Sequence, residues 1–458
     1  MKARILHSWL LWPCFFLAFL LPVRPLLAET LLLINATVHT VTGQVLSPGG
    51  VLIENGKIRG VSGPPYVAAQ THVDQTIDLK GQHLYPGLIA LNTALGLVEI
   101  PAVRASVDDS ETGEFVPDVR SWIAVNPDSE LIPVARANGI TVAEPTPSGG
   151  MIAGQSGLVA LDGWTSEKMA FKTPDALHVY WPDMNINPAS RRGGGAAVGR
   201  GRGGRGGAST ADDQARERRQ KMKELDDYFT DARAYAQARD AAKTNGAPDP
   251  GLNPSWEAML PYLRGQLPIM VHAEDARQIK AAVKWAGTNG YKIIIAGGRD
   301  AWMAADVLAE AKVPVIYDSI YTMPASDFES YDIQYKAPEI LRQAGVKVIF
   351  SIGAAGKEPS EDPSAVRNLP YAAALAVAFG LPPDEAVKGM TLYPAQILGV
   401  DDRLGSIETG KDATLLACDG DILDLRANVK HVWIAGHEVS LETRHTKLYD
   451  KYRSRPKP

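Results

Sequence analysis

Two short stretches of the chain place chemically useful residues at the end of an apolar segment. His272 follows the apolar run 268–271 and precedes Ala273 and Glu274. An imidazole in such a place can bind a metal ion or carry a proton, although an isolated core histidine is more often satisfied by a backbone hydrogen bond. The second stretch ends the apolar run 88–91 with Asn92 and Ala94, whose side chains leave the same face of a strand.

The other histidines do not complete a metal site by their spacing. The chain has nine histidines and two cysteines. A catalytic zinc ion usually needs about three protein ligands. His178 follows a segment that could be a strand, and the remaining histidines fall in the N-terminal leader, at domain boundaries or near the C-terminus: His7, His39, His72, His83, His431, His437 and His445. Cys14 lies in the leader, so Cys418 alone predicts neither a disulfide nor a cysteine-based zinc site.

The elements that position these residues alternate between strands and helices. Apolar segments at 268–271, 292–295, 313–316 and 346–350 are separated by helical patterns at 276–286 and 301–310. This alternation is typical of parallel βα units, whose sites lie just after the strands. Pro86-Gly87 marks a turn before the 88–91 strand, and Asn55-Gly56 marks a hairpin. Residues 209–243 form a charged helix with one apolar stripe, expected to pack on the outside of the fold or on a partner.

The stretch around Pro86 resembles the amidohydrolase superfamily, in its imidazolonepropionase-like branch of metal-dependent hydrolases. In that family P-G-x-I-D-x-H-x-H forms the first barrel strand, and its two histidines bind the catalytic metal. This chain keeps Pro86, Gly87 and Ile89 but has Ala90 for the aspartate and Asn92 and Ala94 for the two histidines. Residues 404–413 and 392–399 also resemble the family's L-G-S-I-E-x-G-K-x-A and T-x-N-P-A-x-x-L-G segments.

The resemblance implies a divergent member in which most metal ligands are replaced. His272 matches the family's metal-binding histidine on its fifth strand. No histidine follows the 292–295 segment, where many members have one, and Gly353 stands near the family's catalytic aspartate. The degenerate ligand positions are therefore Asn92, Ala94 and Gly353, which we expect to cluster with His272 at the barrel mouth. The expected cofactor is one zinc-like divalent metal ion, bound weakly or not at all.

The implied fold is α/β, a (β/α)8 TIM-like barrel with a small discontinuous β-sandwich. We expect the sandwich at 29–83 and 402–445, the barrel at 84–401 and a tail at 446–458. Residues 1–28 combine Lys2 and Arg4 with an apolar run, which predicts a signal peptide; an uncleaved anchor is the alternative. The Arg- and Gly-rich tract 191–207 predicts a disordered insertion, for which a flexible surface loop is favoured over RNA binding.

Two functional hypotheses follow. The first is an exported hydrolase, periplasmic or extracellular, that cleaves non-peptide C–N bonds in small amides or cyclic amides. The second is a catalytically inactive barrel that binds a small molecule, forms a homo-oligomer or pairs with an active homologue. The formal net charge of −5 favours neither nucleic acid nor anionic membranes as partners, and no membrane span is expected after cleavage. Under the second hypothesis, His272→Ala would change stability or ligand binding more than any rate of hydrolysis.

Overall fold

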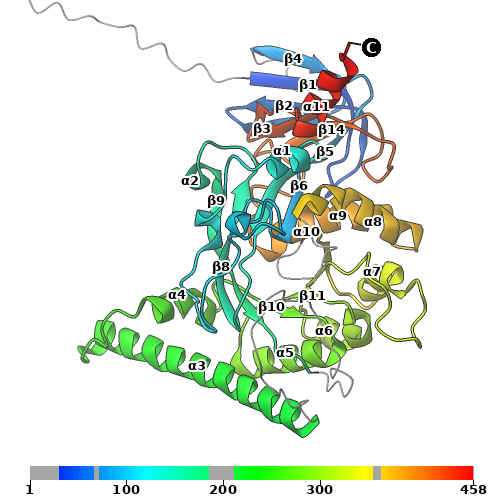
Figure 1. The fold of residues 1–458 in the computed structure, drawn as a ribbon. Helices are drawn as coiled ribbons and strands as arrows, with labels where there is room; N and C mark the ends of the chain where they lie inside the picture. Colours follow the sequence, from blue (N-terminus) through cyan, green and yellow to red (C-terminus); the bar gives the residue numbers. More distant parts are fainter. Residues whose placement is uncertain (1–29, 67–71, 185–210, 354–362, 457–458) are drawn as a thin grey trace, which may run out of the picture.

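A computed structural model describes residues 30–66, 72–184, 211–353 and 363–456. The predicted signal peptide and the 191–207 tract lie outside these residues. The chain forms two eight-stranded sheets with helices around the second one (Figure 1). Within the described ranges, no helix is both long enough and apolar enough to cross a membrane.

The first sheet joins the two ends of the chain. Its N-terminal strands are β1 (Thr30–Val38), β2 (Leu46–Glu54), β3 (Lys57–Ser62), β4 (Gln75–Asp78) and β5 (His83–Pro86). Its C-terminal strands are β14 (Leu415–Cys418), β15 (Val429–Ile434) and β16 (His437–Glu438). Strand β14 pairs antiparallel with β5, which itself pairs parallel with β1. The blue and red segments of Figure 1 therefore lie side by side in one discontinuous unit.

The second sheet is a nearly closed barrel. Its strands, in spatial order, are β6 (Leu88–Thr93), β7 (Ile140–Pro145), β8 (Ile152–Ala160), β9 (Ala170–Tyr180), β10 (Ile269–Ala273), β11 (Ile293–Gly297), β12 (Val315–Tyr317) and β13 (Val348–Phe350). The first and last strands approach each other where Ala94 N donates to Gly353 O at 2.8 Å. The expected barrel is confirmed.

One barrel strand departs from the expected parallel pattern. Strand β8 runs antiparallel to both β7 and β9, whereas the other neighbouring pairs in the barrel sheet are parallel. The connection from Pro145 to Ile152 is too short for the helical crossover that a parallel pair requires. Because β8 is reversed, Ile152, its first residue, lies at the same end of the barrel as Tyr180, the last residue of β9.

Helices cover the barrel. They are α1 (Leu131–Arg136), α2 (Ser166–Met169), α4 (Pro254–Leu263), α5 (Ala276–Asn289), α6 (Ala305–Glu310), α7 (Ile333–Gln343), α8 (Leu369–Ala378), α9 (Pro383–Met390) and α10 (Leu392–Ile397). The exposed C-terminal helix α11 (Arg444–Arg453) lies in the region expected as a tail. Asp275 caps α5 with a capping box, and Gly290 ends it at φ +72°.

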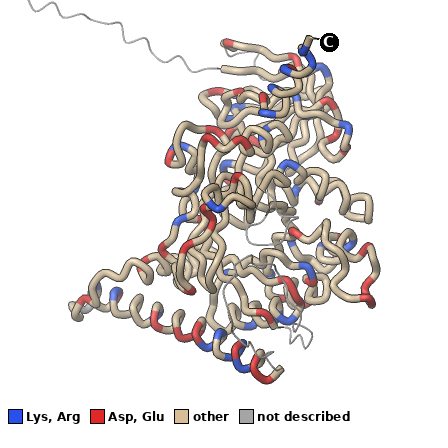
Figure 2. Tube along the Cα trace, in the orientation of Figure 1, with Lys and Arg blue, Asp and Glu red and all other residues tan. Residues whose placement is uncertain are grey.

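The charged helix is α3 (Ala211–Asn245), a long rod at the edge of the molecule (Figure 1). Figure 2 shows both signs of charge along it. Its apolar stripe buries Leu225, Phe229 and Ala232, and the Phe229 ring meets the Trp285 ring of α5 edge-on at 5.0 Å. The helix therefore packs on the outside of the barrel.

Candidate functional site in the barrel interior

The interior of the barrel changes from apolar to polar along its axis. One apolar layer is contributed by adjacent strands and packs on α10: Ile89, Val142, Leu158, Ala176, Met270, Ile294, Ile316 and Ile349. Two residues further toward the C-terminal end of the barrel, the same strand faces continue with a second layer. Six of these second-layer positions are polar: Glu144, Ser156, His178, His272, Asp318 and Ser351.

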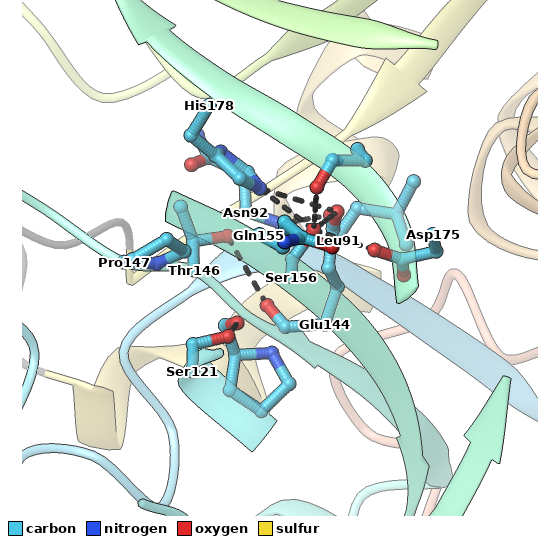
Figure 3. A network of polar contacts seen from close by, with 12 residues as sticks. Leu91, Asn92, Ser121, Glu144, Thr146, Pro147, Gln155, Ser156, Asp175 and His178 are labelled. Atoms are coloured by element: carbon cyan, nitrogen blue, oxygen red, sulfur yellow. Dashed lines mark hydrogen bonds and ion pairs between the residues drawn. The ribbon is translucent and has the colours of Figure 1, made fainter. Parts of the chain in front are cut away.

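Ser156 is at the centre of this polar layer (Figure 3). Its Oγ lies 2.8 Å from Glu144 Oε1, 2.5 Å from Asp175 Oδ1 and 2.7 Å from His178 Nε2. Glu144, Ser156, Asp175 and His178 are all fully buried. Figure 3 shows the three partners converging on the serine from β7 and β9, the two strands that flank β8.

The three short contacts of Ser156 set a lower limit on the number of protons that the cluster holds; a fourth contact, to Ala176 O, is longer at 3.5 Å. A hydroxyl donates one hydrogen bond and accepts two. Two of the three contacts must therefore be donated to Ser156, by a protonated carboxyl of Glu144 or Asp175 or by His178 Nε2–H. At least one buried carboxyl is protonated in any arrangement that satisfies all three contacts, because His178 Nε2 supplies only one donor.

The electrostatics of the cluster agree with this count. Burial, and then the neighbouring Asp175 carboxyl, raises the pKa of Glu144 well above its ordinary value. Burial likewise raises the pKa of Asp175, whose Oδ2 has no hydrogen-bond partner among the described residues. Burial lowers the pKa of His178 to about 3, so this imidazole stays neutral at physiological pH. The cluster thus avoids burying several charges together.

His178 links the buried cluster to His272 on the next strand. His178 Nδ1 lies 2.9 Å from His272 Nε2. His272 is partly buried, and the Tyr180 ring stacks on it with centroids 4.0 Å apart and planes 5° apart. Because each ring nitrogen of His178 faces one partner, a proton can pass from His272 to Ser156 through a change of tautomer.

Asn92 is positioned by the same cluster. Its backbone N donates to Glu144 Oε2 at 3.1 Å, and its Nδ2 donates to Asp318 Oδ2 at 3.4 Å. Its φ is +52°, a left-handed conformation that asparagine tolerates better than most residues. Asn92 is therefore connected to His272 through Glu144, Ser156 and His178.

Ala94 and Gly353 are brought together at the barrel seam. The hydrogen bond from Ala94 N to Gly353 O joins the segments that follow β6 and β13. Gly353 has φ +85°, and a Cβ there would lie 2.7 Å from Val366 Cγ2. Backbone conformation and packing therefore oppose a side chain where the family places its aspartate. The glycine on the sixth barrel strand, Gly297, has the Glu274 carboxylate against it, 2.5 Å from where a Cβ would stand.

The described donor set does not fit a three-ligand metal centre. No group of three or more His, Cys, Asp and Glu side chains in the described ranges is arranged to hold a metal ion. Two nitrogens bound to one tetrahedral zinc ion would lie about 3.3 Å apart. His178 Nδ1 and His272 Nε2 are closer than that, at a hydrogen-bonding distance of 2.9 Å. The Glu144 Oε1 and Asp175 Oδ1 atoms are directed at Ser156.

Sequence reasoning missed most of this cluster. Glu144, Ser156, Asp175 and Asp318 were not singled out, and His178 was placed after a strand although it lies within β9. The sequence signal that could have identified these residues is the alternation of side chains between the two faces of a strand. His178 interrupts the apolar segment 176–179, and Glu144 lies two residues after Val142 at the end of β7.

Comparison with known proteins identifies related chains. A model of the amidohydrolase family matches residues 212–439. The amidohydrolase tasK of Hapsidospora irregularis is 26% identical over 403 residues, which are 85% of this chain and 39% of that protein. An imidazolonepropionase of Pseudomonas fluorescens is 27% identical over 179 residues, 39% of this chain and 41% of that protein. The chain thus spans about two fifths of the length of these two curated relatives.

A solved structure matches over a much larger share of both chains. The crystal structure of an amidohydrolase from Thermotoga maritima covers 90% of this chain and 99% of that one. The TM-score is 0.74 and the sequence identity is 26%. The similarity therefore includes both the barrel and the discontinuous sheet.

Proposed function

The chain belongs to the amidohydrolase superfamily, and we propose that it hydrolyses a C–N bond in a small amide or cyclic amide at the C-terminal mouth of its barrel. The observation that carries the proposal is the continuous hydrogen-bonded path from the Glu144 and Asp175 carboxyls through Ser156 and His178 to His272. Family membership alone would support the fold but not catalysis.

The hydrogen-bonded path costs more folding free energy than a purely structural role would explain. Burying ionisable groups is unfavourable unless each is paired or neutral, and apolar residues of similar volume often serve a core at least as well. The adjacent interior layer shows that this barrel accommodates apolar side chains, with Val142 beside Glu144 and Leu158 beside Ser156. Perturbed buried carboxyls that are hydrogen-bonded, through Ser156 and His178, to His272 at the barrel mouth are therefore a reason to expect chemistry there.

The proposed role of His272 is general base. A water molecule that attacks the carbonyl carbon gives its proton to the His272 imidazole. His272 Nε2 then passes its proton to His178 Nδ1, and His178 Nε2 passes its own to Ser156. The Ser156 hydroxyl proton moves to the ionised carboxylate of Glu144 or Asp175. The return of the proton by the same path can protonate the leaving nitrogen, which restores the starting state.

Each other member of the path positions or stores the proton. Ser156 and His178 transfer the proton between His272 and the carboxyl groups, and the Glu144 and Asp175 carboxyls hold it. Asn92 links Glu144 to Asp318 near the mouth. Ser156 itself is a poor candidate nucleophile, since it is fully buried and two carboxyl groups contact its Oγ. No step is assigned to a metal ion, because the described donor set does not fit one.

We further propose that the protein is exported to the periplasm or the cell exterior and acts there on a small molecule. This proposal rests on the basic and apolar character of residues 1–28. N-terminal sequencing of the protein from a bacterial host tests it. A product beginning near Glu29 in the soluble fraction supports export with cleavage, whereas intact Met1 in the membrane fraction contradicts it.

The activity is tested with a panel of substrates and elemental analysis of the same preparation. The panel contains linear amides, N-acetylated amines and hydantoin-like rings, and the readout is release of amine and carboxylate. Turnover with a sub-stoichiometric metal content supports the proposal as stated. One tightly bound metal ion per chain, with turnover lost on chelation, would replace the proton path by a metal-centred mechanism.

One set of observations favours an inactive barrel instead. Asn92, Ala94 and Gly353 supply no imidazole or carboxylate at three positions where the family has ligands or an acid. If no member of the panel is hydrolysed, while a ligand raises the melting temperature of the unaltered protein but not of His272→Ala, the barrel is a binding module.

A further inference from the structure

A pocket lies at the end of the barrel opposite the polar layer. It has a volume of about 400 Å³ and is formed where β11, β12 and β13 begin, with α10 closing one side. Lys292, Lys312 and Lys347 line it. We propose that this lysine pocket, defined by these three lysines and the apolar residues between them, binds a small organic anion that has an apolar body.

Each of three consecutive connections from a helix to the next strand contains one of the lysines. Lys292 stands two residues after Gly290, Lys347 stands two residues after Gly345, and Lys312 occupies the corner position itself. Both glycines have left-handed backbones, with φ of +72° and +91°. Because β11, β12 and β13 are neighbouring parallel strands, their N-terminal ends bring the three lysines to one edge of the sheet.

Lys312 has the same left-handed backbone, with φ +54°, at the corner where the neighbouring units have glycine. This conformation is unfavourable for a residue with a Cβ. Steric space does not explain why the other two positions have glycine, because a Cβ at Gly290 or Gly345 would meet nothing within 4 Å. A lysine is therefore kept at a position that glycine would fill with less strain, which points to a use for its ammonium group.

The positive charge of the pocket is not neutralised by neighbouring carboxylates. None of the three lysines forms an ion pair with an acidic side chain of the described ranges, whereas many other lysines of the chain do. Lys347 Nζ donates to the neutral Gln396 Oε1 at 2.8 Å. All three lysines are exposed, and three cationic residues that line one cavity favour an anionic ligand.

The walls between the lysines are apolar. Val313, Pro314, Val346 and Ile397 line the cavity, and Val313, Val346 and Ile397 are almost fully buried. A cavity of this size matches pockets that take small organic molecules, in which a few polar groups orient an apolar body. An inorganic ion would leave these walls unused, so the chemistry fits a carboxylate or phosphate monoester with a short hydrocarbon or ring.

The pocket is independent of the proposed hydrolytic site. Its lysines precede the strands, whereas His272 and Asp318 lie at the strands' opposite ends. Sites of barrel enzymes sit at the C-terminal ends of the strands. Failure of the lysine pocket to bind an anion would leave the proposed hydrolysis unaffected, and the reverse also holds.

Isothermal titration calorimetry with hexanoate as the probe tests the proposal. The unaltered protein is expected to bind hexanoate, more weakly at high ionic strength, and to bind inorganic phosphate and hexylamine much less. The triple variant Lys292→Gln, Lys312→Gln, Lys347→Gln is expected to lose about tenfold or more in affinity. Lys312→Gly alone should weaken binding without lowering the melting temperature, because it also relieves the left-handed strain.

A matched control carries the same charge change elsewhere. Lys243→Gln, Lys280→Gln and Lys284→Gln together remove three exposed lysines from α3 and α5 and should leave hexanoate binding unchanged. The proposal is overturned if the pocket variant binds hexanoate as tightly as the control, if the unaltered protein does not bind it, or if phosphate binds equally well. Sedimentation with phosphatidylglycerol vesicles that depends on the same lysines, without binding of free hexanoate, would also overturn it and indicate a membrane surface.

Discussion

Replacement of Ser156 by alanine is the sharpest perturbation of the buried cluster. One hydroxyl satisfies Glu144, Asp175 and His178 at distances of 2.5 to 2.8 Å. All three partners are fully buried, so no water can take its place without a change in packing. A buried polar group left without its partner costs about 1–3 kcal/mol. Ser156→Ala should therefore lower the free energy of unfolding by about 3–6 kcal/mol, more than removal of a few methyl groups alone would.

Urea unfolding of Ser156→Ala beside Ser351→Ala measures this difference. Ser351 is equally buried, but its hydroxyl donates mainly to one neutral carbonyl, Leu91 O at 2.8 Å. Its replacement should cost about 1 kcal/mol. The penalty for Ser156→Ala should also grow as the pH rises, because loss of the hydroxyl donor raises the carboxyl pKa values further. Equal costs for the two variants at every pH would refute the shared-hydroxyl account.

Three further predictions concern separate parts of the molecule. The folded-state pKa of Glu144 is raised, so its contribution to stability is present below its unfolded pKa of about 4.3 and is lost as the pH rises toward the folded pKa. Glu144→Gln should remove this loss, making the slope of unfolding free energy against pH more positive by up to about 1.4 kcal/mol per pH unit, as urea titrations at several pH values would show. Burial raises the pKa of Cys418 to about 12, so a thiol reagent such as DTNB should label it at pH 8 only after unfolding; rapid labelling of the folded protein would contradict this. Gly87→Ala should destabilise the protein, because the new Cβ would lie 2.2 Å from Thr141 Oγ1, whereas Gly287→Ala in α5, with nothing within 4 Å, should stabilise it by about 0.5–1 kcal/mol in the same thermal melt.

Much of the fold could be predicted from the sequence because short sequence patterns specify its strands, turns and helix ends. The Pro86-Gly87 turn, the apolar segment 292–295 and the Gly290 helix end each specify their element within a few residues. The two ends of the chain meet in one sheet, as the family resemblance implied, with β14 beside β5. The direction of β8 was not accessible in this way, since only the short connection before it reveals an antiparallel strand.

The candidate site was harder to predict from the sequence because its contacts depend on the direction and register of neighbouring strands. Ser156 contacts Glu144 and Asp175 only because β8 is reversed and its register sets Ser156 beside Ala176. His272 was identified from its place after an apolar run, but its partner His178 belongs to a strand 94 residues earlier. Single polar residues within apolar strands acquire meaning only when the register between strands is known.

The predicted weak metal binding and the roles of Asn92, Ala94 and Gly353 stay predictions. The structure adds a reason for two of the three replacements. Gly353 has a backbone conformation and a neighbour, Val366, that oppose a side chain. Asn92 uses a left-handed conformation and contacts both Glu144 and Asp318. The packing around Ala94 offers no comparable explanation for the loss of a histidine there.

The central claim is that His272 at the barrel mouth takes the proton in C–N bond hydrolysis. Its most direct test is kcat/KM for the best substrate of the amide panel, measured for His272→Ala beside His437→Ala, a control that removes an exposed imidazole from β16. We predict a loss of about 100-fold or more for His272→Ala, unchanged kinetics for His437→Ala, and the same low metal content in both preparations. Equal kcat/KM in the two variants would contradict the claim.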